Sequence, residues 1–310
     1  MQRRFPWLVL VLSALLAVFP AAAPSAARGQ ELDDDEYAAA IRQLAEGAPE
    51  ARASAADLLG SRAMRRRDAV VPLLRRTLRD DRDWRVRASS GRALGRLGAR
   101  DAVPDLVRAL RDPVVEVRVV AAAALWRLPD PAAVPALLEL LNDRDAAARQ
   151  WGALALGVTR DRRATQPLIA LLGDPERDVR LDAIRSLRRI RDAAAGSALE
   201  RYAADGARAE DERLEAVAAL AALDGPAKVD ALVRLARHPD AAVRTRAIEG
   251  LGRVGDALVV PALRERRRAE TSPQVRSAID GAIREIEDRA RGRSTGEGGG
   301  NPLNLPPLPG

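Results

Sequence analysis

The chain of 310 residues contains no cysteine and a single histidine, His238. The lack of cysteine excludes disulfide bonds and thiolate metal sites, and one histidine excludes a metal site that needs several imidazoles. A serine-type catalytic triad needs a histidine beside its nucleophile. No such partner stands at a recognisable spacing from Ser89, Ser90, Ser186 or Ser197. We therefore expect no metal, no cofactor and no enzymatic activity.

Aromatic residues are also scarce, at 3%, whereas alanine, leucine and arginine are abundant, and this composition favours helices. The net charge is +7, so the 51 basic residues are nearly balanced by 44 acidic ones. Nucleic-acid binding usually shows a concentrated basic stripe, which the linear sequence lacks. We therefore expect no nucleic-acid partner, and a basic groove formed by folding is kept as an alternative.

The segment of residues 1–30 has the three parts of a secretory signal: two early arginines, an almost wholly apolar run at 7–19, and small residues at 21–27. As a helix the apolar run would extend about 20 Å, short of the ~30 Å hydrocarbon core of a bilayer. We expect cleavage after Ala27, no membrane span afterwards, and a periplasmic or extracellular location. An uncleaved membrane anchor is the alternative.

One pattern returns four times between Asp80 and Ile190: an Asp, an Arg six residues later, and a Leu seven residues after that. Successive arginines of these copies are 31 residues apart. A fixed period in this range is typical of stacked two-helix units, each of which contacts only its neighbours. The Asp and Arg residues of the four copies are Asp81 and Arg87, Asp112 and Arg118, Asp143 and Arg149, and Asp174 and Arg180.

We interpret these residues as a structural ladder, in which the Asp caps the second helix of its unit and pairs with an Arg of its own or the next unit. A ladder of ligand-binding groups is the alternative. Looser copies carry Arg52, Arg213, Arg244 and Arg276, which brings the predicted total to about eight units. In the later copies the place of the Asp is held by Ala207, His238 and Glu270, and we expect His238 to be a turn or cap residue.

The pattern divides the chain into four expected segments: a signal peptide at 1–27, an acidic linker at 28–35, the repeats at 36–290, and a Gly/Pro-rich tail at 291–310. We expect the tail to be disordered, because it has too little apolar surface to offset its ordering entropy. A short docking motif formed by its leucines is the alternative.

Residues 174–187 and 243–252 resemble HEAT-like repeats, in particular the short kind first noted in phycobilisome lyases. The resemblance implies an all-α, right-handed α-solenoid of about eight two-helix repeats, with the first helices outside and the second helices lining a concave face. Hydroxylases of this fold carry paired His-Glu metal motifs, which His238 alone cannot supply. Chromophore lyases need a bilin and a phycobiliprotein in their own compartment, and DNA glycosylases need the chromosome. An exported chain would meet none of these.

The three tryptophans after the leader all lie in the second to fourth units. Tryptophan is a favoured interface anchor, although filling of the core is the alternative. The candidate partner-binding residues are Trp84, Arg85, Arg92, Arg96, Trp126, Arg127 and Trp151. We expect a monomeric, exported, non-enzymatic scaffold that binds a protein or peptide along the concave face. An accessory or lyase-type protein acting on a chromophore or polymer is the alternative from another class.

Overall fold

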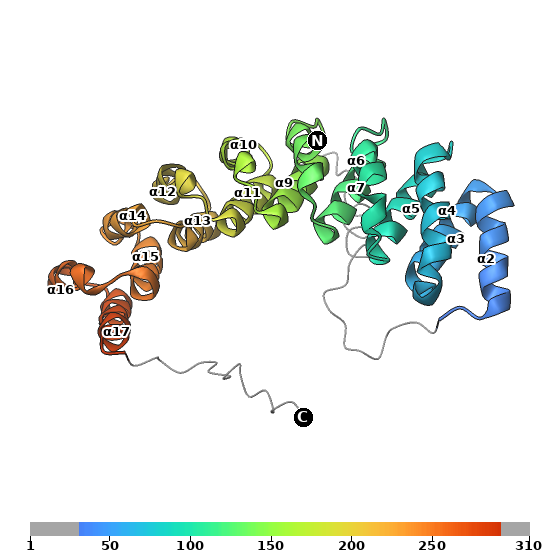
Figure 1. The fold of residues 1–310 in the computed structure, drawn as a ribbon. Coiled ribbons are helices and arrows are strands. Elements are labelled where there is room, and N and C mark those ends of the chain that lie inside the picture. Colours follow the sequence, from blue (N-terminus) through green and yellow to red (C-terminus); the bar gives the residue numbers. More distant parts are fainter. Residues whose placement is uncertain (1–30, 293–310) are drawn as a thin grey trace, which may run out of the picture. The chain divides into compact units, whose positions relative to one another are not determined.

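The computed structural model of the protein describes residues 31–292, and all regular structure in that range is helical. Sixteen described α-helices, joined by short turns, form eight consecutive pairs (Figure 1). The prediction of an all-α repeat fold is thereby confirmed. The predicted signal peptide, part of the linker and most of the tail lie outside the described residues. Within them, every helix is too short or too polar to span a bilayer.

The described chain divides into two compact units, at residues 31–167 and 168–292. The first contains α2 (Asp34–Glu46), α3 (Pro49–Arg62), α4 (Arg67–Asp80), α5 (Trp84–Arg96), α6 (Val103–Ala109), α7 (Val115–Arg127), α8 (Val134–Leu140) and α9 (Ala146–Thr159). The helix α10 (Thr165–Ala170) spans the division. The second contains α11 (Arg177–Ile190), α12 (Gly196–Ala204), α13 (Glu210–Ala222), α14 (Ala227–Leu235), α15 (Ala241–Val254), α16 (Val260–Ala269) and α17 (Pro273–Ala290).

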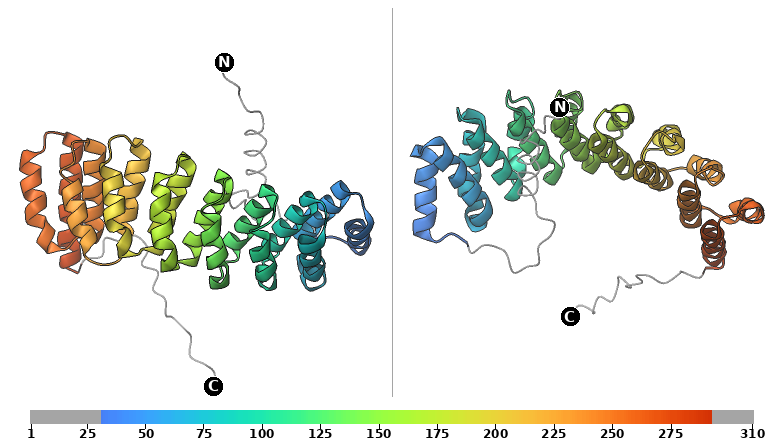
Figure 2. Two further views of the ribbon diagram at one scale, coloured as in Figure 1. Left: turned by 90° about the horizontal axis from the view of Figure 1, so that it is seen from above. Right: turned by 180° about the vertical axis from the view of Figure 1, so that it is seen from behind.

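Within each unit the helices form two layers, because each odd-numbered helix packs on its even-numbered partner and on the odd helices before and after it (Figures 1 and 2). In the second unit the odd helices follow an arc, with α12, α14 and α16 on its outer side (Figure 1). The Leu of the repeating pattern lies in the core of the odd layer, since Leu94, Leu125 and Leu156 are at most 1% exposed. Burial of this leucine in every repeat drives the stacking.

The recurrent Asp does not cap the second helix of its pair, contrary to the prediction. The N-cap of α7 is Val114, whose N–H donates to the side chain of Asp112, two residues earlier, at 2.9 Å. Other carboxylates serve as caps: Asp83 for α5 and Asp145 for α9. The recurrent Asp thus forms a turn with its own backbone. Both oxygens of Asp112 also accept from Arg87, so the Asp pairs with the arginine of the preceding repeat and not, as was expected, with one of its own or the next.

Glycines mark the points at which neighbouring odd helices approach most closely. A Cβ atom added to Gly60 would lie 2.4 Å from the Cβ of Ala93, and one added to Gly95 would lie 3.0 Å from the Cβ of Ala124. The same repeat position in α7 holds Trp126 instead. The contact between α7 and α9 therefore includes the Trp126 indole. In the contacts between α3 and α5 and between α5 and α7, a glycine at this position lets the backbones approach.

Candidate functional site

Three ladder arginines of the first unit, Arg52, Arg87 and Arg118, each tie their own repeat to the next one. The Nε and Nη2 atoms of Arg87 donate to the two carboxylate oxygens of Asp112 at 2.8 and 2.9 Å, and Nη1 donates to the carbonyl oxygen of Asp81 at 2.9 Å. Hydrogen bonding to the Asp112 carboxylate raises the pKa of Arg87, although its burial acts in the opposite direction. Equivalent bidentate contacts occur in Arg52–Asp81 and Arg118–Asp143.

Two further ladder residues make the local part of the same arrangement. The Nη1 atom of Arg149 donates to the carbonyl oxygen of Asp143 at 3.0 Å, as Arg87 does to Asp81. Asp174 accepts a hydrogen bond from the N–H of Glu176 at 2.9 Å. Arg149 therefore keeps the backbone contact of the other copies, and Asp174 keeps their turn.

In the second unit the ladder is completed by carboxylates that the spacing does not identify. Arg180 donates to Glu212 at 3.0 Å, and Arg213 donates to Asp240 at 2.7 Å. Ala207 and His238 therefore do not supply the paired carboxylates. The expectation that His238 is a turn residue is confirmed, because its Nδ1 accepts the N–H of Asp240 at 3.1 Å, and its carbonyl oxygen accepts from Arg244.

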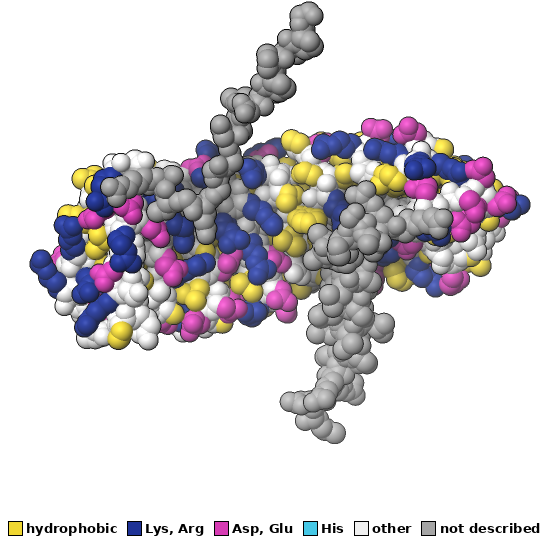
Figure 3. Space-filling model, turned by 90° about the horizontal axis from the view of Figure 1, so that it is seen from below, with side chains coloured by type: hydrophobic (Ala, Val, Ile, Leu, Met, Phe, Trp, Pro, Cys, Tyr) yellow, Lys and Arg dark blue, Asp and Glu magenta, His cyan; other side chains and the backbone are white. Residues whose placement is uncertain are grey.

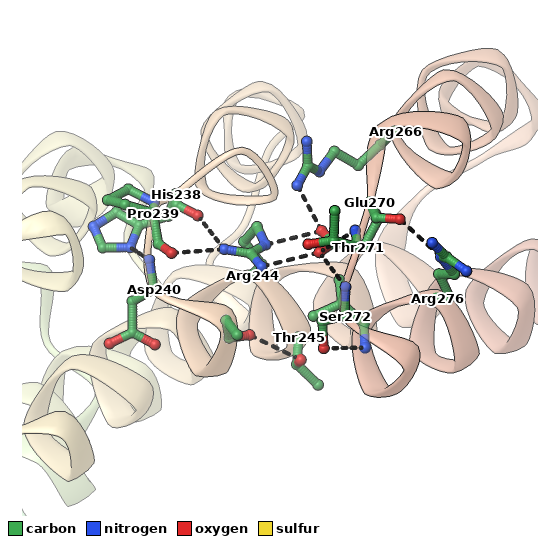
Figure 4. Close-up of polar contacts among 12 residues, drawn as sticks. His238, Pro239, Asp240, Arg244, Thr245, Arg266, Glu270, Thr271, Ser272 and Arg276 are labelled. Atoms are coloured by element: carbon green, nitrogen blue, oxygen red, sulfur yellow. Dashed lines mark hydrogen bonds and ion pairs between the residues drawn. The ribbon is translucent and has the colours of Figure 1, made fainter.

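Glu270 fills the last rung of the ladder, as its position predicts (Figure 4). Its two oxygens accept from Nε and Nη2 of Arg244 at 3.0 Å each, and it also accepts from Arg266 and from the N–H of Ser272. Burial by itself would raise the pKa of Glu270, but the backbone and guanidinium donors outweigh it and hold the pKa at about 2. The charged groups of this rung are thus paired within the protein, which is a structural role.

Five of the candidate partner-binding residues lie on three consecutive odd helices of the first unit. We call these five residues the Arg-Trp surface: Arg92 and Arg96 of α5, Trp126 and Arg127 of α7, and Trp151 of α9. On α5, Ser89, Arg92 and Arg96 lie within about 60° of one another around the helix axis, at about 100° per residue. One side of α5 therefore faces this surface.

Asp57 of α3 borders the Arg-Trp surface and was not among the predicted residues. Its carboxylate accepts from Ser89 Oγ at 2.8 Å and from Arg92 Nη1 at 2.9 Å, and Arg96 Nη1 approaches it at 3.5 Å. Asp57 follows Arg52 by five residues, as Arg92 follows Arg87, so alignment of the repeats could have found it. One carboxylate here faces two guanidinium groups, which leaves an excess of positive charge.

The positive charges continue from α5 to α7. Burial lowers the pKa of Arg96, with Asp57 opposing the shift and Arg92 adding to it. Burial and the neighbouring charge of Arg96 lower the pKa of Arg127. Arginine remains protonated in proteins, so both shifts report cations held close together, with Arg96 half-buried and Arg127 exposed.

The two tryptophans of the surface contact each other across α7 and α9. Their ring centroids are 6.3 Å apart and the ring planes meet at 78°, an edge-to-face arrangement. Both side chains are half-buried. Trp126 takes the repeat position of Gly60 and Gly95, and Arg127 follows it directly in α7.

The structure does not bring Trp84 and Arg85 to the Arg-Trp surface. Trp84 is the first residue of α5 and points about 140° away from Ser89 around the helix, at about 100° per residue. Arg85 pairs with Asp83 and with Glu50, both at 2.7 Å. Trp84 is 38% exposed, which makes it a matched control for the other two tryptophans.

Two cavities among the described residues lie at the ladder. A cavity of about 430 Å³ is lined by Asp112, Arg118 and Asp143, and another of about 520 Å³ by Arg52 and Asp81. In the first, Arg118 is already paired with Asp143, and in the second Arg52 is already paired with Asp81. Among residues 31–292 there is no group of three or more acidic or histidine side chains placed to hold a metal ion.

The face of the molecule in Figure 3 carries charges of both signs, with basic and acidic side chains interspersed. Hydrophobic side chains gather near the middle of this view. A single continuous basic stripe, which a groove for nucleic acid would need, is not present on the described part of this face.

Comparison with known families assigns the repeats to a family. The sequence profile of HEAT repeats matches residues 37–125, 108–188, 134–211 and 207–284, and the chain belongs to the HEAT-repeat family. The resemblance noted from the sequence is confirmed. A comparison with curated proteins finds no match.

Several solved structures are similar to the chain. The complex of CpcE and CpcF of phycocyanin lyase from Nostoc is 24% identical, with 86% of this chain and 100% of that chain covered and a TM-score of 0.47. An engineered protein is 20% identical, with coverages of 82% and 79% and a TM-score of 0.54. YibA from Escherichia coli is 20% identical, with coverages of 81% and 82% and a TM-score of 0.50. At this level of identity the likeness concerns the fold alone.

Proposed function

We propose that the protein is an exported scaffold without catalytic activity of its own, which binds a protein or peptide partner on the Arg-Trp surface. The observation that carries the proposal is the Trp126–Trp151 pair beside Arg127. Stacking does not require these indoles, because Gly60 and Gly95 show how the odd helices pack without them. Tryptophan and arginine are the residues that most often dominate binding energy at interfaces.

The helical layer supports binding for a second reason. In the first unit the part-buried bidentate pairs Arg87–Asp112 and Arg118–Asp143 hold successive repeats together, so the side chains of α5, α7 and α9 are presented on rigid elements. A rigid surface loses little conformational entropy when a partner binds. The fold thus offers an extended contact area without ordering any loop.

The binding proposal is tested by cross-linking in an extract of the source cells and identification of captured proteins by mass spectrometry. The intact protein is compared with Trp151→Ala and with Trp84→Ala, which removes an indole outside the surface. We expect Trp151→Ala to lose a specific set of proteins that Trp84→Ala retains. Equal recovery by all three would contradict a contact centred on the Arg-Trp surface.

Export is proposed from the composition of residues 1–27 alone. A fusion of residues 1–35 to a reporter enzyme that folds only outside the cytoplasm measures it directly. We expect reporter activity and cleavage after Ala27, shown by N-terminal sequencing of the released product. A matched fusion with Arg3→Glu and Arg4→Glu should lose activity, because the signal needs its positive n-region. An inactive parent fusion would rule out export.

A further inference from the structure

We infer that the partner of the Arg-Trp surface is a short extended polypeptide segment that carries acidic side chains next to an aromatic or aliphatic one. This inference rests on the function proposed above and adds the chemistry of the partner. It is carried by the charge excess around Asp57, by the unused donors of Arg96, and by the position of the two indoles.

Arg96 is the clearest indication of an acidic partner. A ladder arginine such as Arg87 uses three nitrogens in hydrogen bonds of 2.8–3.1 Å. Arg96 has a single contact among the described residues, the 3.5 Å approach of Nη1 to Asp57, although only 28% of its side chain is exposed. A guanidinium has five N–H donors in a planar fork that fits a carboxylate. The other donors of Arg96 are therefore available to an incoming carboxylate.

The surrounding charges favour the same partner. Asp57 is shared by Arg92 and Arg96, and the side chain of Arg127 reaches α5 beside Gly95. Desolvation and the charge of Arg96 lower the pKa of Arg127. A carboxylate between Arg96 and Arg127 would offset this repulsion, and the half-burial of Arg96 would strengthen its attraction. A basic segment would add to the excess of positive charge.

The indoles define the apolar part of the segment and its length. Trp126 and Trp151 lie beyond Arg127 in the direction of α9, so an apolar side chain would follow the acidic ones along the partner. Neighbouring helices are about 9 Å apart, so the two steps from α5 to α9 span about 18 Å. An extended chain covers that distance with about six residues.

A single-stranded nucleic acid fits the same residues less well. Bases stack on exposed flat faces of aromatic rings. Here the rings of Trp126 and Trp151 meet edge-to-face and are half-buried, so one ring covers part of the other. The carboxylate of Asp57 at the border of the surface would also repel phosphate. We therefore assign the surface to an acidic peptide, and nucleic acid becomes an outcome of the test.

The test uses the full chain after removal of residues 1–27, immobilised and exposed to a phage library of random peptides about twelve residues long, twice the expected footprint. We expect the selected peptides to combine Asp or Glu with Leu, Ile, Phe or Trp. Their affinity, measured by fluorescence anisotropy, should fall about tenfold or more in Arg96→Gln and in Arg127→Gln, since each removes a charged contact. The matched control Arg108→Gln removes one exposed charge from α6 and should leave affinity within twofold.

A second selection uses the charge-reversed variant Arg96→Glu, whose thermal unfolding is checked by circular dichroism. It should enrich basic peptides in place of acidic ones. Peptides without acidic residues that depend on Trp151 but not on Arg96 or Arg127 would overturn the acidic chemistry and leave the proposed function standing. If no peptide is selected, or if a fluorescent oligothymidine binds more tightly than the peptides through the same arginines, the proposed function falls as well.

Discussion

Arg244 and Glu270 form a buried bidentate ion pair that joins α15 to the start of the final helix. Both hydrogen bonds are 3.0 Å, and the Glu270 side chain is 1% exposed. The remaining donor of Arg244, Nη1, binds the carbonyl oxygen of His238 at 2.8 Å. The last rung of the ladder thus has the same geometry as Arg87–Asp112, with a longer acid in place of the Asp.

This pair predicts acid sensitivity of the second unit. The pKa of Glu270 in the folded state is about 2, below the value of about 4.3 expected in the unfolded chain. A lowered pKa means that the stabilisation is complete above the unfolded value and is lost as the pH falls toward the folded one. We expect the urea midpoint of the wild type to drop between about pH 5 and pH 2 more steeply than that of Glu270→Gln. Parallel curves for the two proteins would show that this carboxylate is not responsible.

At neutral pH the same variant should be less stable, because Arg244 and Arg266 are left without their carboxylate. We expect Glu270→Gln to lower the free energy of unfolding by about 3 kcal/mol, in the range seen when one partner of a buried pair is removed. Urea unfolding followed by circular dichroism gives this value. If the free energy of unfolding fell no more than it does for a substitution at an exposed site, water would be shown to solvate Arg244 and Arg266 in place of the carboxylate.

A double-mutant cycle separates the ladder from surface ion pairs. Arg118 and Asp143 are 16% and 11% exposed, and we expect a coupling of about 1–3 kcal/mol between Arg118→Ala and Asp143→Ala. The control cycle uses Arg111 and Glu139, which also form a short bidentate pair but are 60% and 59% exposed. That pair should show no measurable coupling, since solvent screens it. Equal coupling in the two cycles would mean that burial does not strengthen the ladder.

Two glycines predict opposite effects of the same substitution. Gly60→Ala should destabilise the protein by about 1–3 kcal/mol, because its new Cβ would lie 2.4 Å from that of Ala93 and force α3 and α5 apart. Gly281→Ala, inside α17 with no atom within 4 Å of the new Cβ, should stabilise by about 0.5–1 kcal/mol through helix propensity. Thermal unfolding of both variants checks the two signs, and destabilisation by Gly281→Ala would contradict the open space there.

The tryptophan pair predicts a spectroscopic signature. Two indoles 6.3 Å apart at a fixed angle should give a near-ultraviolet circular dichroism signal that is lost equally in Trp126→Phe and Trp151→Phe. The corresponding alanine cycle should show a coupling of about 0.5–1.5 kcal/mol. Trp84→Phe is the control, since Trp84 is not part of the pair. A signal that survives either substitution in the pair would come from another source.

The repeats of the first unit were predictable because their ladder residues and leucines recur at one constant spacing. Arg87, Arg118 and the leucines that follow them recur at a period of 31, and the structure pairs both arginines with the Asp that this period supplies. In the second unit the register shifts, and Arg180 takes Glu212 from inside α13. Sequence spacing could not show this, because the choice depends on which carboxylate the packing brings within reach.

The candidate site was predictable only in part. Composition and position singled out the tryptophans, but the bounds of α5 were needed to show that Trp84 belongs to the helix and therefore points away from Ser89. Asp57 was missed because it carries no signal of its own. Only alignment with Arg92 in the next repeat shows that it faces the same side.

The ladder arginine holds the backbone of its own repeat and the carboxylate of the following one, so the link has a direction along the chain. One consequence concerns how such a chain changes length. Excision of the 31 residues from Asp112 to Asn142 would present Asp143 to Arg87 in the register that Asp112 now occupies. An excision displaced by a few residues would break the arginine–carboxylate pairs on both sides of the deletion. Gain or loss of whole periods is therefore the change in length that leaves the remaining pairs intact.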